Sequence, residues 1–331
     1  MLPSSTPLCW IRGSRFWAVA ETKPIPDSVE SLTMKKLTFR LFAGVVAGVL
    51  SLSVGSALAQ DADLVASGAE VELLVDGFIF TEGPAADAEG HVYFSDIPAN
   101  TNYLWTNDGE LQTFRENSNG TNGLFFDRDW QLFAAEGGAG RITMLDSNGQ
   151  ATVVINEHGG QRFNSPNDLW VDADGGLYFT DPRYGDESNN PQPGYYVYYL
   201  APGADAAVAI ITDLVKPNGI IGTRDGQTLY VADHLGNETY AYDISAPGEL
   251  THKRLFASQG SDGVTLDEHG NLYLTGGNNI TVYSPAGELL ETLTFPLAPA
   301  NMTFGGPDRN VLFVTARSSL FALPMNVRGM Y

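Results

Sequence analysis

The sequence predicts an all-β protein, a six-bladed β-propeller, and three observations support this prediction. A short motif recurs six times, in which an acidic or amide residue opens a strand, a tight turn follows, and an aromatic and β-branched strand comes next. The copies begin 40, 45, 51, 44 and 39 residues apart, which is typical of one blade per repeat. No stretch of the repeats shows a helical period. The copies begin at Glu82, Asn122, Asn167, Asn218, Asp262 and Asn301.

Within each copy, the residues after the opening strand have the chemistry of a hairpin turn. Asp and Gly recur there, in the segments 87–90, 172–175, 224–226 and 267–270. A strand such as 176–180 follows, rich in the residue types that favour sheets. In the first copy, we expect the third and fourth strands at 103–105 and 111–114, on either side of the turn 107–109. Each copy therefore predicts one four-stranded blade.

The last copy lacks its fourth strand, and one additional strand precedes the first copy. After Asn301 the chain holds two strands and a third at 319–323, whereas the strand 71–75 precedes the first copy and belongs to no blade. We expect this strand to complete the sixth blade, which would close the ring and leave no open sheet edge. We expect the segments 60–70 and 325–331 to be loosely ordered tails.

The first 59 residues are not expected to belong to the propeller. Residues 34–59 combine a basic start, an apolar run and the sequence Ala57-Leu58-Ala59, which is the pattern of a secretory signal peptide. The apolar run is short for a transmembrane span. We interpret residues 1–33 as a mis-assigned upstream segment, the alternative being a cytoplasmic extension with a membrane anchor. Residues 60–331 then form a single domain in an exported protein, periplasmic or secreted.

The cysteine content and the net charge exclude several classes of function. The only cysteine, Cys9, lies before the predicted cleavage site, so disulfides and thiol chemistry are excluded from residues 60–331. The whole chain carries a formal charge of −21, and residues 60–331 carry −24, because six basic and three acidic residues precede them. Such an acidic surface disfavours nucleic acid and anionic membranes as partners. We expect a monomer or a weak oligomer that acts on a small molecule.

The six opening residues converge on the central axis if each occupies the same place in its blade. An Asn or Asp that opens a strand can simply cap nearby backbone groups, and this explains any single copy. Six copies in phase, mixing Glu82 and Asp262 with four amides, instead indicate a ring of hard oxygen donors for Ca²⁺, Mg²⁺ or Mn²⁺. His158, His234 and His269 are scattered and lack zinc-like spacing.

The sequence around these residues resembles the gluconolactonase/regucalcin (SGL, SMP-30/gluconolactonase/LRE-like) family. The resemblance runs from about residue 70 to about residue 320 and is specific when its motifs are taken together. The segment 178–185 resembles the secreted bacterial gluconolactonase branch. The motifs read Phe80-Thr81-Glu82-Gly83-Pro84, Phe163-Asn164-Ser165-Pro166-Asn167-Asp168, Lys216-Pro217-Asn218-Gly219-Ile220 and Ser261-Asp262-Gly263.

The resemblance implies a six-bladed propeller with one divalent cation at its centre, Ca²⁺ first, with Mg²⁺, Mn²⁺ or Zn²⁺ as alternatives. By position, the metal ligands are Glu82, Asn167, Asn218 and Asp262. Asp262 also matches the residue proposed as general base, although it could be a ligand only. Asn167 would help to hold the substrate carbonyl oxygen. The catalytic residues are thus expected to be Asp262 and Asn167.

Substrate contacts are less well defined. The family's regucalcin-type members use an Arg two residues before the blade-three Asn, but that place is Ser165 here, and Arg162 lies three residues further back. We predict Asn122, Arg162 and Asn301 as substrate-binding residues. His234 and Asp233 are candidates for the pocket wall, and Asp233 is alternatively a structural turn residue.

These expectations favour metal-dependent hydrolysis of a sugar lactone of the glucono-1,5-lactone type to the aldonic acid. The cation would polarise the lactone carbonyl and activate a water, and Asp262 would take the proton. One alternative is another lactone or organophosphate esterase on the same scaffold. A second is a non-enzymatic propeller that binds a ligand or calcium.

Overall fold

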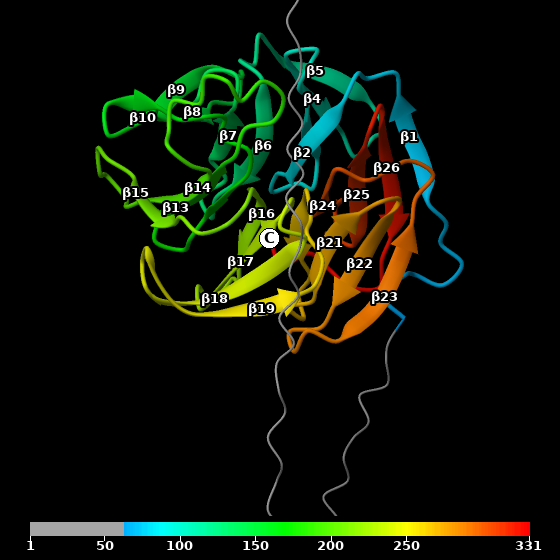
Figure 1. Ribbon diagram of the computed structural model, residues 1–331. Helices are drawn as coiled ribbons and strands as arrows, with labels where there is room; N and C mark the ends of the chain where they lie inside the picture. The colour runs from blue at the N-terminus through cyan, green and yellow to red at the C-terminus, as the bar shows by residue number, and fades with distance from the viewer. Residues whose placement is uncertain (1–62) are drawn as a thin grey trace, which may run out of the picture. The chain divides into compact units, whose positions relative to one another are not determined.

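A computed structural model of the protein describes residues 63–331, in which six four-stranded antiparallel sheets surround a common axis (Figure 1). The predicted upstream segment 1–33 and signal peptide 34–59 lie outside the described residues. The described residues form strands and no helix, which confirms the predicted fold class. Accordingly, this part of the chain contains no helix of a length and hydropathy that would cross a membrane.

Each blade consists of four strands that are consecutive in the chain, except the sixth. The first contains β2 (Thr81–Ala86), β3 (Val92–Asp96), β4 (Thr101–Trp105) and β5 (Leu111–Glu116). The second contains β6 (Thr121–Phe126), β7 (Leu132–Glu136), β8 (Arg141–Leu145) and β9 (Ala151–Ile155). The third contains β12 (Leu169–Val171), β13 (Leu177–Asp181), β14 (Tyr196–Leu200) and β15 (Val208–Ile211). A small hairpin precedes it, made of β10 (Glu157–His158) and β11 (Gln161–Arg162).

The fourth and fifth blades follow the same plan. The fourth contains β16 (Pro217–Gly222), β17 (Thr228–Asp233), β18 (Glu238–Ala246) and β19 (Glu249–Ala257). The fifth contains β20 (Val264–Leu266), β21 (Leu272–Gly276), β22 (Asn279–Tyr283) and β23 (Leu289–Thr294). The sixth contains β24 (Asn301–Gly305), β25 (Val311–Ala316), β26 (Ser319–Pro324) and β1 (Glu72–Asp76).

The chain start closes the ring, as predicted. Strand β1 pairs antiparallel with β26, with Glu72 opposite Ala322 and Asp76 opposite Ser319. The innermost strands of neighbouring blades are in contact all the way round, from β2 through β6, β12, β16 and β20 to β24 and back to β2. Because β1 supplies the outer edge of the blade that lies beside the first one, both ends of the propeller are held in one sheet.

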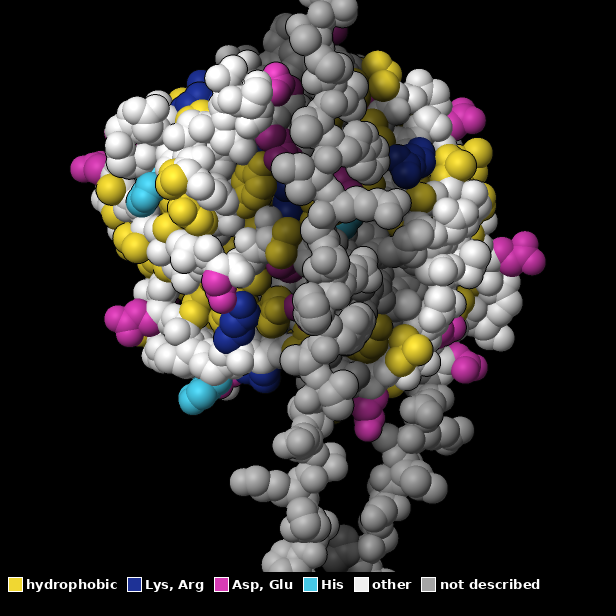
Figure 2. Space-filling model, in the orientation of Figure 1, with side chains coloured by type: hydrophobic (Ala, Val, Ile, Leu, Met, Phe, Trp, Pro, Cys, Tyr) yellow, Lys and Arg dark blue, Asp and Glu magenta, His cyan; other side chains and the backbone are white. Residues whose placement is uncertain are grey.

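The core lies between the blades, where facing sheets bury aromatic and aliphatic side chains. One cluster joins the third, fourth and fifth blades and includes Trp170, Ile220, Leu229 and Val264, each at most 5% exposed. The period-two pattern of each strand directs these residues into the gaps between sheets. Acidic side chains instead project around the rim of the face drawn in Figure 2, as the acidic composition requires.

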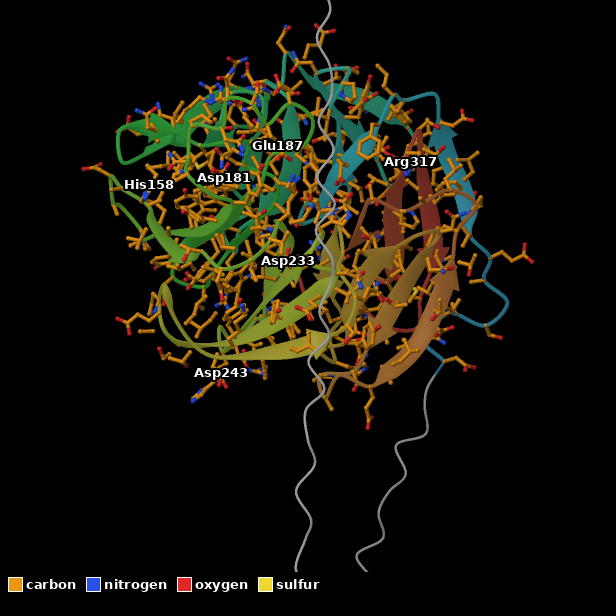
Figure 3. All side chains as sticks on the ribbon, in the orientation of Figure 1. His158, Asp181, Glu187, Asp233, Asp243 and Arg317 are labelled. Atoms are coloured by element: carbon orange, nitrogen blue, oxygen red, sulfur yellow. The ribbon has the colours of Figure 1, made fainter. Side chains whose placement is uncertain are left out.

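An aspartate at the end of the second strand fixes the loop that leads into the inner strand of the same blade. Asp181 accepts hydrogen bonds from the backbone N–H groups of Asn164 and Ser165, at 2.9 and 2.7 Å. Asp233 accepts in the same way from Val215 N and Lys216 N, at 2.8 and 2.7 Å. Figure 3 labels both aspartates on their blades. Asp233 therefore acts as a structural turn residue, the second of the two roles considered for it.

The expectation of loose tails is wrong for the described tail residues. Met325 and Val327 are 1% and 4% exposed, and Met325 pairs in a β-bridge with Val65. The hydroxyl of Tyr331 accepts a hydrogen bond from Trp170 Nε1 at 3.0 Å, which places the chain end beside the third blade. Figure 1 shows this end near the middle of the ring. The sequence lacks periodicity here because the segment packs by single side chains rather than as a strand.

We predict that Met325→Ala lowers the free energy of unfolding by about 2–4 kcal/mol, as for a core methionine. Urea denaturation followed by tryptophan fluorescence measures this change. The control is Leu290→Ala, at a side chain that is 40% exposed, for which we expect a change within about 0.5 kcal/mol. Equal, small changes for both variants would mean that the tail contributes little to stability.

Candidate active site

The six residues that open the sequence repeats stand at or just before the starts of the six inner strands. Four of them have little exposure, Glu82 at 3%, Asn218 at 1%, and Asn167 and Asn301 at 7% each. Asp262 and Asn122 are partly buried. Since all six inner strands begin at the same end of the ring, these side chains form one polar ring around the axis, here called the axial ring. It comprises Glu82, Asn122, Asn167, Asn218, Asp262 and Asn301.

Glycines let neighbouring blades approach at this level. A Cβ on Gly83 would lie 2.0 Å from the carbonyl oxygen of Asn122, and one on Gly263 would lie 2.2 Å from the side chain of Asn301. Real side chains cannot occupy such positions, so each glycine is required by the next blade's axial residue. The same holds for Gly123 and Gly219. The recurring acid–Gly or Asn–Gly pair is therefore the sequence signature of a closed axial ring.

The third blade has an acid where four of the other five blades have glycine, the sixth having Met302. Asp168 follows Asn167, is 7% exposed, and accepts hydrogen bonds from Leu169 N at 2.9 Å and Ile220 N at 3.3 Å. Gly123 leaves room for it, because a Cβ there would lie 2.8 Å from the Asp168 carboxylate. Asp168 belongs to one of the sequence motifs, but the motif alone does not indicate its role. Its place in the repeat, where four blades carry glycine, is the signal that distinguishes it.

Asn218 connects the ring to the loops above it. Its Nδ2 donates to Asp262 Oδ1 at 2.5 Å and to the hydroxyl of Tyr184 at 2.8 Å. The same hydroxyl lies 3.0 Å from Nδ1 of His234. Tyr184 comes from the loop after β13 and His234 from the turn after β17. The sequence placed His234 near the pocket, but it did not predict the contribution of Tyr184.

The remaining predicted residues differ in their surroundings. Asn301 Oδ1 accepts a hydrogen bond from Met302 N at 2.8 Å. Asn122 Oδ1 is buried and has no hydrogen-bond partner among the described residues. Arg162 is exposed and donates to the backbone carbonyls of Phe163 and Asn164, each at 3.1 Å. The structure thus brings Asn122 and Asn301 into the ring, whereas Arg162 binds to the loop that precedes Asn167.

Carboxyl groups are crowded at the axial ring, and this changes their pKa values. Burial, and next the charge of Asp262, raises the pKa of Glu82 well above its usual value. Burial raises the pKa of Asp168 to about 7, and Asp262 adds to the increase. Burial also raises the pKa of Asp262, although His234 and the hydrogen bond from Asn218 oppose it. Ionisation of all these carboxyl groups together is therefore unfavourable unless a positive charge joins them.

This donor set fits a divalent cation. Buried carboxylates and amide oxygens are the hard ligands that Ca²⁺ and Mg²⁺ take, and the unpartnered Oδ1 of Asn122 is a further oxygen with no other bond. Residues 63–331 hold no cluster of three or more His, Cys, Asp or Glu with metal-binding geometry, so a cation here would depend on the amides as well. Glu82, Asn167, Asn218 and Asp262 are the residues that would hold it.

A cleft opens beside Asp262 on the same face of the propeller. It has a volume of about 510 Å³, and loops of the fourth, fifth and sixth blades line it together with the residue before β2. Its walls include Phe80, His234, Ser261 and Arg317. Arg317, labelled in Figure 3, is exposed at the end of β25. Asp262 is thus the axial residue that a small molecule bound in this cleft would meet.

The comparisons with known proteins agree with this geometry. The model of the SMP-30/Gluconolactonase/LRE-like region matches residues 80–318. The chain belongs to this family. A gluconolactonase of Zymomonas mobilis is 30% identical over 281 residues, which cover 74% of this chain and 78% of that protein.

Solved structures extend the similarity. A gluconolactonase from Xanthomonas campestris has a TM-score of 0.74 and 30% identity, covering 80% of this chain and 94% of that one. A regucalcin from Agrobacterium tumefaciens, described as a calcium-binding protein, has a TM-score of 0.67 and 21% identity, covering 79% of this chain and 95% of that one. The second similarity shows the shared fold alone.

We predict that the metal-free protein loses stability as the pH rises from about 4 to about 7. Burial raises the pKa of Asp168 from 3.8 to about 7, so the folded state favours its protonated form. That preference stabilises the fold at low pH and is lost through this window, by at most about 4 kcal/mol. Thermal unfolding in EDTA across this range measures the effect.

Asp168→Asn is the decisive variant, because its side chain is neutral at every pH. We expect its melting temperature to vary less with pH than that of the wild type. The control is Asp213→Asn, where the replaced side chain is 64% exposed, and it keeps the wild-type profile. An unchanged profile in Asp168→Asn would show that another group causes the pH dependence.

Proposed function

We propose that the protein hydrolyses a sugar lactone of the glucono-1,5-lactone type to the aldonic acid, with a divalent cation held by Glu82, Asn167, Asn218 and Asp262. The observation that carries this proposal is the position of Asp262, which belongs both to the axial ring and to the wall of the adjacent cleft. Relatives named gluconolactonase and lactonase support lactone hydrolysis as the reaction class.

The cation, when bound, would act as a Lewis acid toward the lactone carbonyl and lower the pKa of a water. The chain's own contribution is to orient the substrate and to accept a proton. Asp262 Oδ1 already accepts a hydrogen bond from Asn218, and no residue in 63–331 donates to Oδ2. Oδ2 is therefore the atom we assign as proton acceptor.

Electrostatics keeps Asp262 available as a base. His234 and the amide of Asn218 oppose the effect of burial on its pKa and favour the ionised form. Asn218 is held in turn by Tyr184, whose hydroxyl lies between Asn218 Nδ2 and His234 Nδ1. We infer that Tyr184 positions Asn218, which then orients Asp262. Asn167, buried across the ring, is assigned to hold the carbonyl oxygen.

Polar groups in the cleft suit a polyhydroxylated ring. His234, Ser261 and Arg317 line it and can donate hydrogen bonds to hydroxyl groups, while Phe80 offers an apolar surface. Arg317 has no carboxylate partner within 4.0 Å among residues 63–331, so its guanidinium is free to bind substrate. We therefore favour the cleft beside Asp262 as the place where the lactone binds.

The test is acid release from glucono-1,5-lactone in a pH-stat, with spontaneous hydrolysis subtracted. We expect turnover that disappears with EDTA and returns with one divalent ion. Asp262→Asn retains an amide oxygen as a ligand but cannot accept the proton, so we expect kcat to fall by about 100-fold or more. Calorimetric titration with the same ion shows whether this variant still binds the cation.

Arg254→Gln is the matched control, because Arg254 is a partly exposed residue on β19 that pairs with Asp243 at the rim, and we expect wild-type turnover. Absence of turnover with every ion, in folded protein that binds the cation, would contradict the sugar-lactone proposal. Full activity of Asp262→Asn would instead show that Asp262 is only a ligand.

A further inference from the structure

One turn recurs in all six blades, between the inner strand and the second strand, and its last residue is unusual in two of them. The N–H of that residue donates to the carbonyl three residues earlier in every blade. Four blades use glycine there, with φ between 69° and 88°. The second and sixth blades instead use Trp130, with φ 59°, and Arg309, with φ 54°. The four glycines are Gly90, Gly175, Gly226 and Gly270.

The turn itself does not require these two side chains. Residues with a Cβ rarely adopt this backbone conformation, and a bulky residue held there is an indication of function. Trp130 and Arg309 also meet, since the guanidinium carbon of Arg309 lies 4.9 Å from the ring centre of Trp130. Trp130 nevertheless remains 45% exposed. Two strained residues from different blades thus form one cation–π pair at the surface.

The pair stands at the mouth of a cavity that runs along the axis. The cavity has a volume of about 360 Å³ and reaches from the level of Asp168 and Asn301 to the turns of Trp130 and Arg309. Because the inner strands start at the axial ring and end at these turns, the mouth lies on the face opposite the cleft of Asp262. The walls are mainly apolar, formed by Leu124, Phe126, Val171, Ile220, Val264 and Met302. Size and lining are those of a small-molecule site.

Arginines gather at this mouth in an otherwise acidic protein. Arg128 and Arg224 line the cavity together with Arg309. None of the three has an Asp or Glu carboxylate within 4.0 Å among residues 63–331, whereas five other Lys and Arg side chains there do. Of the five N–H donors on each side-chain guanidinium, Arg128 and Arg224 each use one, to backbone carbonyls. Arg309 uses two, one to a backbone carbonyl and one to the main-chain oxygen of Tyr331, the last residue of the chain, at 3.0 Å, and that oxygen belongs to a carboxylate. Most of their donors remain available to an anion.

One acidic side chain, Asp127, also lines the cavity at this end, and its oxygens accept hydrogen bonds from its own turn. Asp127 Oδ1 accepts from Asp129 N at 2.9 Å and Gln131 N at 2.8 Å, and Oδ2 accepts from Gln131 Nε2 at 3.3 Å. It therefore stabilises the turn that presents Trp130 and does not pair with the arginines. The charge facing the mouth is positive on balance, three guanidinium groups against the Asp127 carboxylate and the terminal carboxylate of Tyr331.

We propose that this axial cavity is a second binding site, which takes a small amphipathic carboxylate, an alkyl or aryl chain with one anionic end. The chain lies between the apolar walls, and the carboxylate binds Arg128, Arg224 and Arg309 beside the ring of Trp130. The mouth of this site and the cleft of Asp262 are at opposite ends of the inner strands, and only the inner end of the cavity reaches the axial ring, at Asn301.

Calorimetric titration of the full-length protein with decanoate tests the proposal, with decanol as the uncharged probe. We expect saturable binding of one decanoate per chain and at least about tenfold weaker binding of decanol, because the charge-assisted hydrogen bonds are absent. Trp130→Gly and Arg309→Gly install the residue that four other blades use. We expect both to weaken decanoate binding about tenfold or more while leaving the melting temperature unchanged or higher.

Arg224→Gln provides a variant that does not alter a strained turn, and we expect the same loss of affinity. Arg254→Gln, at the rim, keeps wild-type affinity. Equal affinity for decanoate and decanol, or unchanged decanoate binding in Arg224→Gln and Arg309→Gly, would overturn the proposal. Binding is measured as heat, so this result does not depend on whether the protein hydrolyses lactones.

Discussion

The convergence of six strand starts on one axis is the constraint on which the rest of the structure depends. It requires blades close enough for the backbone of one to touch the axial residue of the next, and only glycine permits this at Gly83 and Gly263. The pairing of β1 with β26 maintains that closeness, since it joins the two ends of the ring. Without closure, the oxygen donors of the axial ring would not meet.

Closure of the ring also brings three buried carboxyl groups close together, and their mutual repulsion determines the chemistry of the site. Glu82, Asp168 and Asp262 are carried into low-dielectric surroundings near one another, and burial raises the pKa of each. Like charges at this distance favour protonation or a cation. Amides from the other blades supply oxygen atoms without adding charge, which explains why the axial ring mixes the two residue types. The same asymmetry leaves Asp262 at the edge of the cleft, where it can react.

The sequence predicts the parts of this molecule that repeat. The acidic or amide residue before each inner strand, the turn chemistry and the unpaired strand 71–75 together indicate six blades closed by the chain start, and the structure confirms this. Contacts made by residues outside the repeat pattern could not be predicted from the repeats. Tyr184 reaches Asn218 from an irregular loop, and Met325 packs without a periodic pattern. The meeting of Trp130 and Arg309 joins different blades, and a repeat alone does not indicate such contacts.

The most direct test of the account is a crystal structure of residues 60–331 grown with Mn²⁺, using anomalous scattering to locate the ion. The account predicts one strong anomalous peak on the propeller axis, with oxygen atoms of Glu82, Asn167, Asn218 and Asp262 around it at about 2.0–2.6 Å. An axis without an anomalous peak, in a crystal where Mn²⁺ binds elsewhere, would contradict the claim that the axial ring is a cation site.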